Sequence, residues 1–239
     1  MDQDQLIAML GKREELHPDL ALYLQEDDTF GTSLRHPLVF SILHTKHMNA
    51  YVNAQYTYKR KALDEAVKKC KWSQYIWLHE RPYRLDAFSN IAWRLEGPTL
   101  YWELLGEIWI DSENIFQNRD EWRDVLEQTY DDEQKHWHHM SRPEDRVVFT
   151  LTPEKGGLLD HTLIFRGYSD EDGLDGFSWT LDRARAKWFA RRRNREGQTP
   201  LVAEALVARA DVLAYHTGRD EQEIVALPEC VVVNKVEEV

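Results

Sequence analysis

The sequence predicts an α+β fold, in which a helical N-terminal region, residues 1–146, packs on a small mixed β-domain, residues 147–239. Two observations lead to this prediction. Between Pro37 and Pro82 the chain contains neither Gly nor Pro, which favours one or two long helices. After Pro143, turn residues and short apolar runs replace this helical pattern and indicate strands. The expected boundary therefore falls near residue 146.

The N-terminal region is expected to be a bundle of helices. Gly97 and Pro98 mark a turn, and the apolar residues that follow it recur at the i, i+3, i+4, i+7 spacing of one helix face. These residues are Tyr101, Leu104, Leu105 and Ile108. A further short helix is expected over Asn118–Gln128.

The C-terminal region is expected to contain strands around one helix. The apolar run His161–Tyr168 predicts a strand, and a turn-rich acidic loop, Ser169–Gly176, follows it. Thr180 can cap a helix over Leu181–Arg193, because its hydroxyl accepts a backbone N–H, and Asp182 then lies in the first turn, where the helix dipole favours a negative charge. The other extended segments are expected at Phe177–Thr180, Leu201–Arg209, Glu221–Leu227 and Val231–Val233.

Composition limits the class of protein. The chain has 239 residues, of which 42% are hydrophobic and 30% charged, and both values suit a globular protein. A formal net charge of -12 argues against general affinity for nucleic acid, because phosphate binding needs a positive surface. Cys70 and Cys230 lie far apart and share no CxxC spacing, so ordinary reduced thiols are expected.

The cellular location is expected to be cytoplasmic. The first ten residues carry acids where a secretion signal carries Lys or Arg. No window approaches the ~20 apolar residues that span a bilayer, so no membrane partner is expected.

Several common catalytic and metal motifs are missing from the sequence. It contains no GxxxxGK[ST], GxSxG or HExxH pattern, which removes support for a P-loop enzyme, an α/β-hydrolase or a zincin. Two groups of histidines lack a carboxylate or Cys at a known metal spacing, so no metal site is expected. These groups are His44 with His47, and His136 with His138 and His139.

Three short segments of the C-terminal region combine residues that suit chemistry. Phe165-Arg166-Gly167 ends the first predicted strand, Ser178-Trp179-Thr180 precedes the predicted helix, and Glu221-Gln222-Glu223 begins a later strand. Because residues two apart on a strand share a face, Glu221 and Glu223 should project together. Taken singly, each charge also has a structural interpretation, with Arg166 paired to the acids of the following loop and the two glutamates on a solvated strand edge.

The order of these segments resembles the arginine–serine–glutamate class of ADP-ribosyltransferases. The longer pattern FRG…GFSWT…AKWFA…EQEIV is also similar to a group of bacteriophage proteins with that fold, over about Leu163 to Pro228. Two features depart from the class: only 11 residues separate Arg166 from Ser178, and Trp179 stands where Thr is common. The resemblance implies an ADP-ribosyltransferase-like β-domain that takes NAD as its substrate.

The resemblance also implies a reaction and its partners. The expected activity is mono-ADP-ribosyl transfer from NAD to a macromolecule, with a protein of a bacterial host as the leading acceptor, in the host cytoplasm. With water as acceptor the same site would be an NAD glycohydrolase. The alternative from another class is a non-catalytic phage protein that keeps the fold and sequesters a host protein or nucleotide.

The NAD-binding residues that the resemblance implies are Arg166, Gly167, Trp179 and Thr180. A fixed guanidinium can hold a pyrophosphate bidentately, which is the role implied for Arg166. Gly167 would allow the backbone to approach the ligand closely.

The implied catalytic residues are Glu223, Glu221 and Ser178. Breaking the nicotinamide–ribose bond develops positive charge on the ribose, and the Glu223 carboxylate would stabilise that charge. Ser178 would orient this carboxylate by a hydrogen bond, and Glu221 would engage the acceptor.

A basic run, Arg183–Arg195, follows the second segment. It can serve as a patch for phosphates of a ligand, for nucleic acid or for an acidic partner, or it can be a solvated helix face. Trp188 and Phe189, within this run, are expected in the core.

Overall fold

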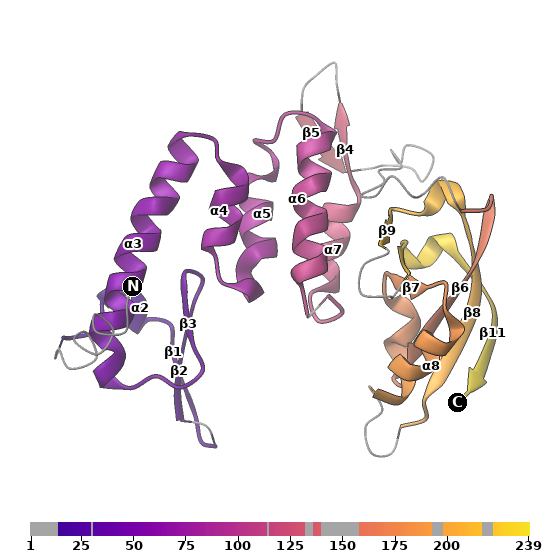
Figure 1. The fold of residues 1–239 in the computed structure, drawn as a ribbon, viewed down its shortest axis with the longest axis horizontal. Coiled ribbons are helices and arrows are strands. Elements are labelled where there is room, and N and C mark those ends of the chain that lie inside the picture. The colour runs from indigo at the N-terminus through magenta and orange to yellow at the C-terminus, as the bar shows by residue number, and fades with distance from the viewer. Residues whose placement is uncertain are drawn as a thin grey trace. The chain divides into compact units, whose positions relative to one another are not determined.

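A computed structural model describes residues 14–29, 31–113, 115–131, 136–139, 158–192, 198–216 and 222–239. These residues form α-helices and antiparallel sheets, which confirms the predicted α+β class (Figure 1). The chain divides into two compact units, Met1–Arg94 with Glu107–Glu113, and Leu95–Gly106 with Asn114–Val239. The boundary predicted from sequence, between residues 146 and 147, lies outside the described residues and stays a prediction.

The first unit contains the long helical segment that the sequence predicted. Its longest helix has 20 residues, and shorter helices follow it before residue 93. The helices are α2 (Pro18–Ala21), α3 (Asn49–Lys68), α4 (Trp72–Leu78) and α5 (Arg84–Ala92), with 3-10 turns η1 (Lys46–Met48) and η2 (Arg81–Tyr83). The helical prediction between Pro37 and Pro82 is therefore confirmed for most of its length.

The same unit also holds a three-stranded antiparallel sheet, so the prediction of an entirely helical N-terminal region was wrong. Its strands are β1 (Leu24–Asp27), β2 (Gly31–His36) and β3 (Val39–Ser41). Gly31, with φ +81, adopts the left-handed conformation that reverses the chain before β2, and Pro37 lies in the turn before β3. The strands bury Leu34 and Val39 in the core of this unit, together with Leu20, Leu38, Val52 and Tyr56.

The second unit begins with helical structure, and α6 (Pro98–Asp111) belongs to it through Gly106. The helix predicted over Asn118–Gln128 is α7 (Arg119–Leu126). The Tyr101 hydroxyl in α6 donates a hydrogen bond to the Val125 carbonyl in α7 at 2.8 Å. An antiparallel pair, β4 (Gln128–Asp131) with β5 (His136–His139), follows where the sequence predicted only helices.

A six-stranded antiparallel sheet dominates the rest of this unit (Figure 1). The strand order is β11-β8-β6-β7-β10-β9. The strands are β6 (His161–Tyr168), β7 (Ser178–Thr180), β8 (Leu201–Ala208), β9 (Ala214–His216), β10 (Glu223–Val225) and β11 (Val231–Glu238). Among the described strands every pairing is antiparallel, so the sheet is not of mixed direction; β9 was not predicted and β11 extends beyond its predicted end at Val233.

The two faces of this sheet bury different side chains. On one face, α8 (Arg183–Arg192) packs on β6, and Ala186 and Ala190 contact Phe165 and Val202. The opposite face carries the main core of the unit, whose members include Ile164, Tyr168, Trp179, Ala203, Ala205 and Ile224. This division follows from strand alternation, because consecutive residues of β6 point to opposite faces.

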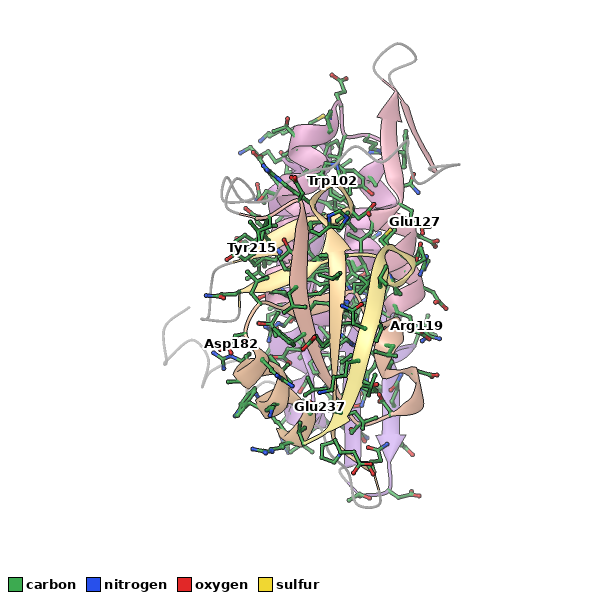
Figure 2. The ribbon with its side chains drawn as sticks, turned by 90° about the vertical axis from the view of Figure 1, so that its right-hand side faces the viewer. Trp102, Arg119, Glu127, Asp182, Tyr215 and Glu237 are labelled. Carbon is green, nitrogen blue, oxygen red and sulfur yellow. The ribbon has the colours of Figure 1, made fainter. Side chains whose placement is uncertain are left out.

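One edge of the sheet is β11, which lies beside β8 and carries Glu237 (Figure 2). The pairing with β8 shifts register between Val233 and Lys235, and the side chains from Val232 to Val236 are exposed. In the part of the chain that the structure describes, no helix combines the length and the apolar character needed to cross a membrane.

Candidate functional site

The three segments singled out in the sequence lie on neighbouring strands. Strand β7 pairs with β6 on one side and with β10 on the other. One row of cross-strand partners runs Phe165, Thr180, Glu223 and His216, from β6 to β9. Since directly paired residues share a face, these four side chains project toward the face that α8 covers in part. The predicted proximity of the three segments is confirmed.

Ser178 and Glu223 form the central polar contact of the site. The Ser178 hydroxyl donates a hydrogen bond to Glu223 Oε1 at 2.5 Å, the short distance typical of a hydroxyl bonded to a carboxylate. Both residues are half-buried. The hydrogen bond predicted from the resemblance is therefore present, and it fixes the orientation of the carboxylate.

The Arg166 guanidinium holds backbone segments together. Arg166 is only 7% exposed, its Nε donates to the Gly173 carbonyl at 2.5 Å, and its Nη1 donates to the Ser178 carbonyl. A Cβ added at Gly176 would lie 1.9 Å from Arg166 Nη2, so a larger residue would displace the guanidinium. These contacts join the loop around the 3-10 turn η5 (Glu171–Asp175) to β7. Binding of a pyrophosphate by Arg166 stays a prediction.

Gly167 serves helix packing. A Cβ at this position would lie 1.9 Å from the Ala186 carbonyl oxygen and 2.7 Å from the Ala190 nitrogen. Gly167 therefore allows α8 to approach β6 closely, which is a different reason for glycine from the ligand approach expected from the sequence.

Trp179 and Thr180 point to opposite faces of β7. The indole of Trp179 is 2% exposed and packs in the core with Ile164 and Ile224, so it cannot stack on a ligand in front of Glu223. Thr180 Oγ1 accepts a hydrogen bond from the Asp182 nitrogen at 3.0 Å. The helix begins at Arg183 rather than at Leu181, and its cap is Asp182, whose Oδ1 accepts from the Ala184 nitrogen at 2.7 Å.

An open pocket joins these residues. It comprises about 430 Å³ of space outside the atoms, including some open solvent, and it reaches every predicted site residue that the structure describes. The lining residues are Phe165, Arg166, Gly167, Ser178, Trp179, Thr180, Phe189 and Glu223. Glu221, the remaining predicted residue, lies outside the described residues.

Sequence reasoning missed the two phenylalanines of this pocket. Phe165 is adjacent to the predicted arginine, and Phe189 lies on α8, where it was expected in the core together with Trp188. Phe189 is half-buried at the pocket, and Trp188 is 44% exposed. An aromatic residue one position from the Arg-Gly pair was a usable signal, whereas the position of Phe189 depends on which face of α8 meets the sheet.

His216 is a second residue that the sequence did not indicate. It is the direct cross-strand partner of Glu223 and is 5% exposed. Its Nε2 atom has no hydrogen-bond partner among the described residues. Burial lowers the pKa of His216, because the charged imidazolium loses its hydration. A neutral, buried histidine therefore lies beside the candidate catalytic carboxylate.

The described residues offer no group of three or more His, Cys, Asp or Glu side chains that could hold a metal ion. Comparison with known proteins gives no match: no family model fits the chain, and no curated protein or solved structure is significantly similar to it. The function of this chain must therefore be inferred from the chemistry of the site itself.

Proposed function

We propose that this chain transfers ADP-ribose from NAD to a macromolecular acceptor. The observation that carries the proposal is the hydrogen-bonded pair of Ser178 and Glu223 in an open pocket lined by two phenylalanines. A carboxylate held in a fixed orientation suits a reaction that develops positive charge on a sugar, because no reorganisation is needed when the charge appears. The resemblance to bacteriophage proteins points to a protein of a bacterial host as the acceptor.

The proposed chemistry is cleavage of a glycosidic bond. The bond between the ribose C1′ and the nicotinamide nitrogen breaks, and its electron pair leaves with neutral nicotinamide. Glu223 stabilises the ribosyl cation, and a nucleophile of the acceptor forms the new bond to C1′ and releases its proton. The aromatic rings of Phe165 and Phe189 suit contact with a planar, apolar part of the substrate.

Arg166 has a supporting role in this proposal. Its bonds to the carbonyls of Gly173 and Ser178 hold β7, and thereby the hydroxyl that orients Glu223. The resemblance also implies direct contact between Arg166 and the pyrophosphate, although strand alternation points the Arg166 side chain to the face of β6 opposite Phe165 and Glu223. In Arg166→Lys, a lysine keeps the charge but loses the planar fork of donors, so we expect weaker binding of NAD together with slower turnover.

Glu223→Gln tests the proposed reaction. The substitution keeps size and hydrogen-bonding capacity but removes the negative charge, and loss of such an electrostatic contact costs about a hundredfold or more in rate. We expect a folded variant that binds NAD but neither releases nicotinamide nor labels an acceptor at a significant rate. Glu204→Gln is the matched control, because Glu204 is the cross-strand neighbour of Phe165 and lies outside the residues that line the pocket.

The same assay distinguishes the role of Glu221 from that of Glu223, and binding of NAD distinguishes an enzyme from a non-catalytic protein. If Glu221 engages the acceptor, Glu221→Gln should suppress labelling of protein and leave cleavage of NAD by water. Wild-type activity that survives Glu223→Gln contradicts the mechanism. A well-folded wild type that shows no binding of NAD in calorimetry supports the non-catalytic alternative, in which the buried Arg166 network serves only the fold.

A further inference from the structure

Helix α8 exposes a tryptophan between two arginines. Trp188 is 44% exposed, although the sequence placed it in the core. The guanidinium carbon of Arg185 lies 5.6 Å from the centroid of the Trp188 ring, and that of Arg192 lies 4.8 Å from it. The i, i+3 and i, i+4 spacings of a helix bring these three side chains to one surface. The buried residues of α8 are Ala186 and Ala190, so this surface, which we call the Trp188 patch, lies away from β6.

The helix that carries the patch is positively charged, although the chain as a whole carries a net charge of -12. Arg183 and Lys187 on α8, and Lys235 on β11, all lie within 4 Å of the Glu237 carboxylate. Hydrogen bonds from Lys235 and Arg183 lower the pKa of Glu237 to about 2. α8 itself contains five cationic residues and no acidic one. The helix that carries the exposed indole therefore contains cations and no carboxylate, and two of these cations, Arg185 and Arg192, lie beside the ring.

We propose that the Trp188 patch binds single-stranded nucleic acid. An unpaired base would stack on the exposed indole, and the flanking guanidiniums of Arg185 and Arg192 would contact phosphates. The carboxylates of an acidic protein partner would pair with the two arginines, but they would not account for the exposure of the indole ring between them. In a duplex the bases are already stacked on one another, so the ring would have no face of a base to contact.

This binding activity is independent of the proposed reaction, but the two sites are adjacent. Phe189, which lines the pocket, packs edge-to-face against Trp188 with ring centroids 5.0 Å apart. A strand held by the Trp188 patch would therefore lie beside the pocket that contains Glu223.

The test is fluorescence anisotropy of short labelled oligothymidylate and oligouridylate with the full chain. We expect the wild type to bind, and Trp188→Leu to bind roughly tenfold more weakly, because leucine keeps apolar volume but cannot stack on a base. Trp188→Phe should retain most of the affinity. Arg192→Gln should weaken binding and reduce the slope of log K against log salt by about 0.7, the contribution of one phosphate contact on a single strand.

Trp93→Leu is the matched control, because Trp93 in the other unit is 68% exposed and also has an arginine, Arg94, 4.7 Å from its ring. It should bind as the wild type does. Equal affinity of Trp188→Leu and the wild type, or no binding of either oligonucleotide by the wild type, overturns the proposal. So does a labelled polyglutamate peptide that binds to the patch more tightly than the oligonucleotides. The nicotinamide assay is run separately, so its outcome does not affect this test.

Discussion

Glu223 depends on a neighbouring strand for the position of its carboxylate. The Ser178 hydroxyl that bonds it belongs to β7, and the Ser178 carbonyl is itself held by Arg166. Both of these contacts are partly shielded from water, which strengthens them. The candidate catalytic group is therefore placed by a chain of hydrogen bonds that begins at a buried arginine.

Ser178→Ala should weaken this arrangement without removing the charge. Because a hydrogen bond to a charged group contributes about 1.5–3 kcal/mol, we expect nicotinamide release to fall roughly tenfold or more, with Glu223 still present. Ser169→Ala is the control, because the Ser169 hydroxyl also bonds a side chain, Gln198, at 3.2 Å and lies outside the pocket lining. A Ser178→Ala enzyme as fast as the wild type would show that the hydroxyl does not position the carboxylate.

At the level of secondary-structure elements, the contact between α8 and β6 determines the position of Phe189 at the pocket. Ala186 and Ala190 have the smallest side chains that still form a helix well, and Gly167 opposite them has none. This combination of small residues lets the helix backbone approach the strand. Phe189, which directly precedes Ala190 on α8, is thereby brought to the pocket.

Gly167→Ala should be strongly destabilising for this reason. The added methyl group would overlap backbone atoms of α8, which cannot rotate away as a side chain can. Overpacking of this kind costs about 1–3 kcal/mol or more, and we expect the loss in urea unfolding monitored by circular dichroism. Gly97→Ala is the comparison: nothing lies within 4 Å of its added Cβ, and its φ of +82 alone should cost about 1–2 kcal/mol. A smaller loss at Gly167 than at Gly97 would contradict the packing argument.

For the whole molecule, buried histidines predict a loss of stability in mild acid. Burial lowers the pKa of His36, His79 and His216 in the folded chain. The unfolded chain, with a histidine pKa of about 6.5, then binds more protons than the folded chain, so the free energy of unfolding falls as the pH drops through about 6.5. Urea unfolding at a series of pH values from about 8 to 5 measures this effect. A free energy of unfolding that stays constant over this range would contradict it.

A second loss is expected at lower pH. The pKa values of Asp19, Glu65 and Glu237 are lowered, chiefly by hydrogen bonds from Tyr56, Lys69 and Lys235 respectively. A lowered carboxyl pKa contributes stability above the unfolded value, and this contribution disappears as the pH falls below about 4. The two steps can be distinguished because the first begins near the histidine pKa of the unfolded chain, about 6.5, and the second near its carboxyl pKa, about 4.

The sequence predicted those elements whose signals are local. The apolar run of β6 was predicted at the observed residues, and the long stretch without Gly or Pro contains α3. Strands β1 to β3 were missed because each is short and pairs with neighbours that cannot be recognised from a periodic pattern. Strand β9 is only three residues long, and it is identified by its pairing with β10.

The candidate site was predicted only in part, because its segments give local signals but the pairing between them does not. The order of Arg166, Ser178 and Glu223 is visible in the sequence, and strand alternation relates residues within a segment. Which side chains meet depends on register across strands, and this register places His216 beside Glu223 and the indole of Trp179 on the far face. The exposure of Trp188 likewise depends on which side of α8 contacts β6.

The shift of register in β11 has a consequence for how copies of this chain behave together. An edge strand has a row of unpaired N–H and C=O groups with which a strand of another chain can pair. A shift of register or a lysine in the edge strand hinders this pairing. β11 has both, since the shift lies between Val233 and Lys235 in an otherwise exposed and valine-rich strand. A variant that lacks Asn234 and carries Lys235→Val should therefore aggregate at high concentration, which light scattering measures. The control is the wild-type chain with the single substitution Glu238→Gln, which should stay dispersed. Equal scattering by both would show that this strand needs no such protection.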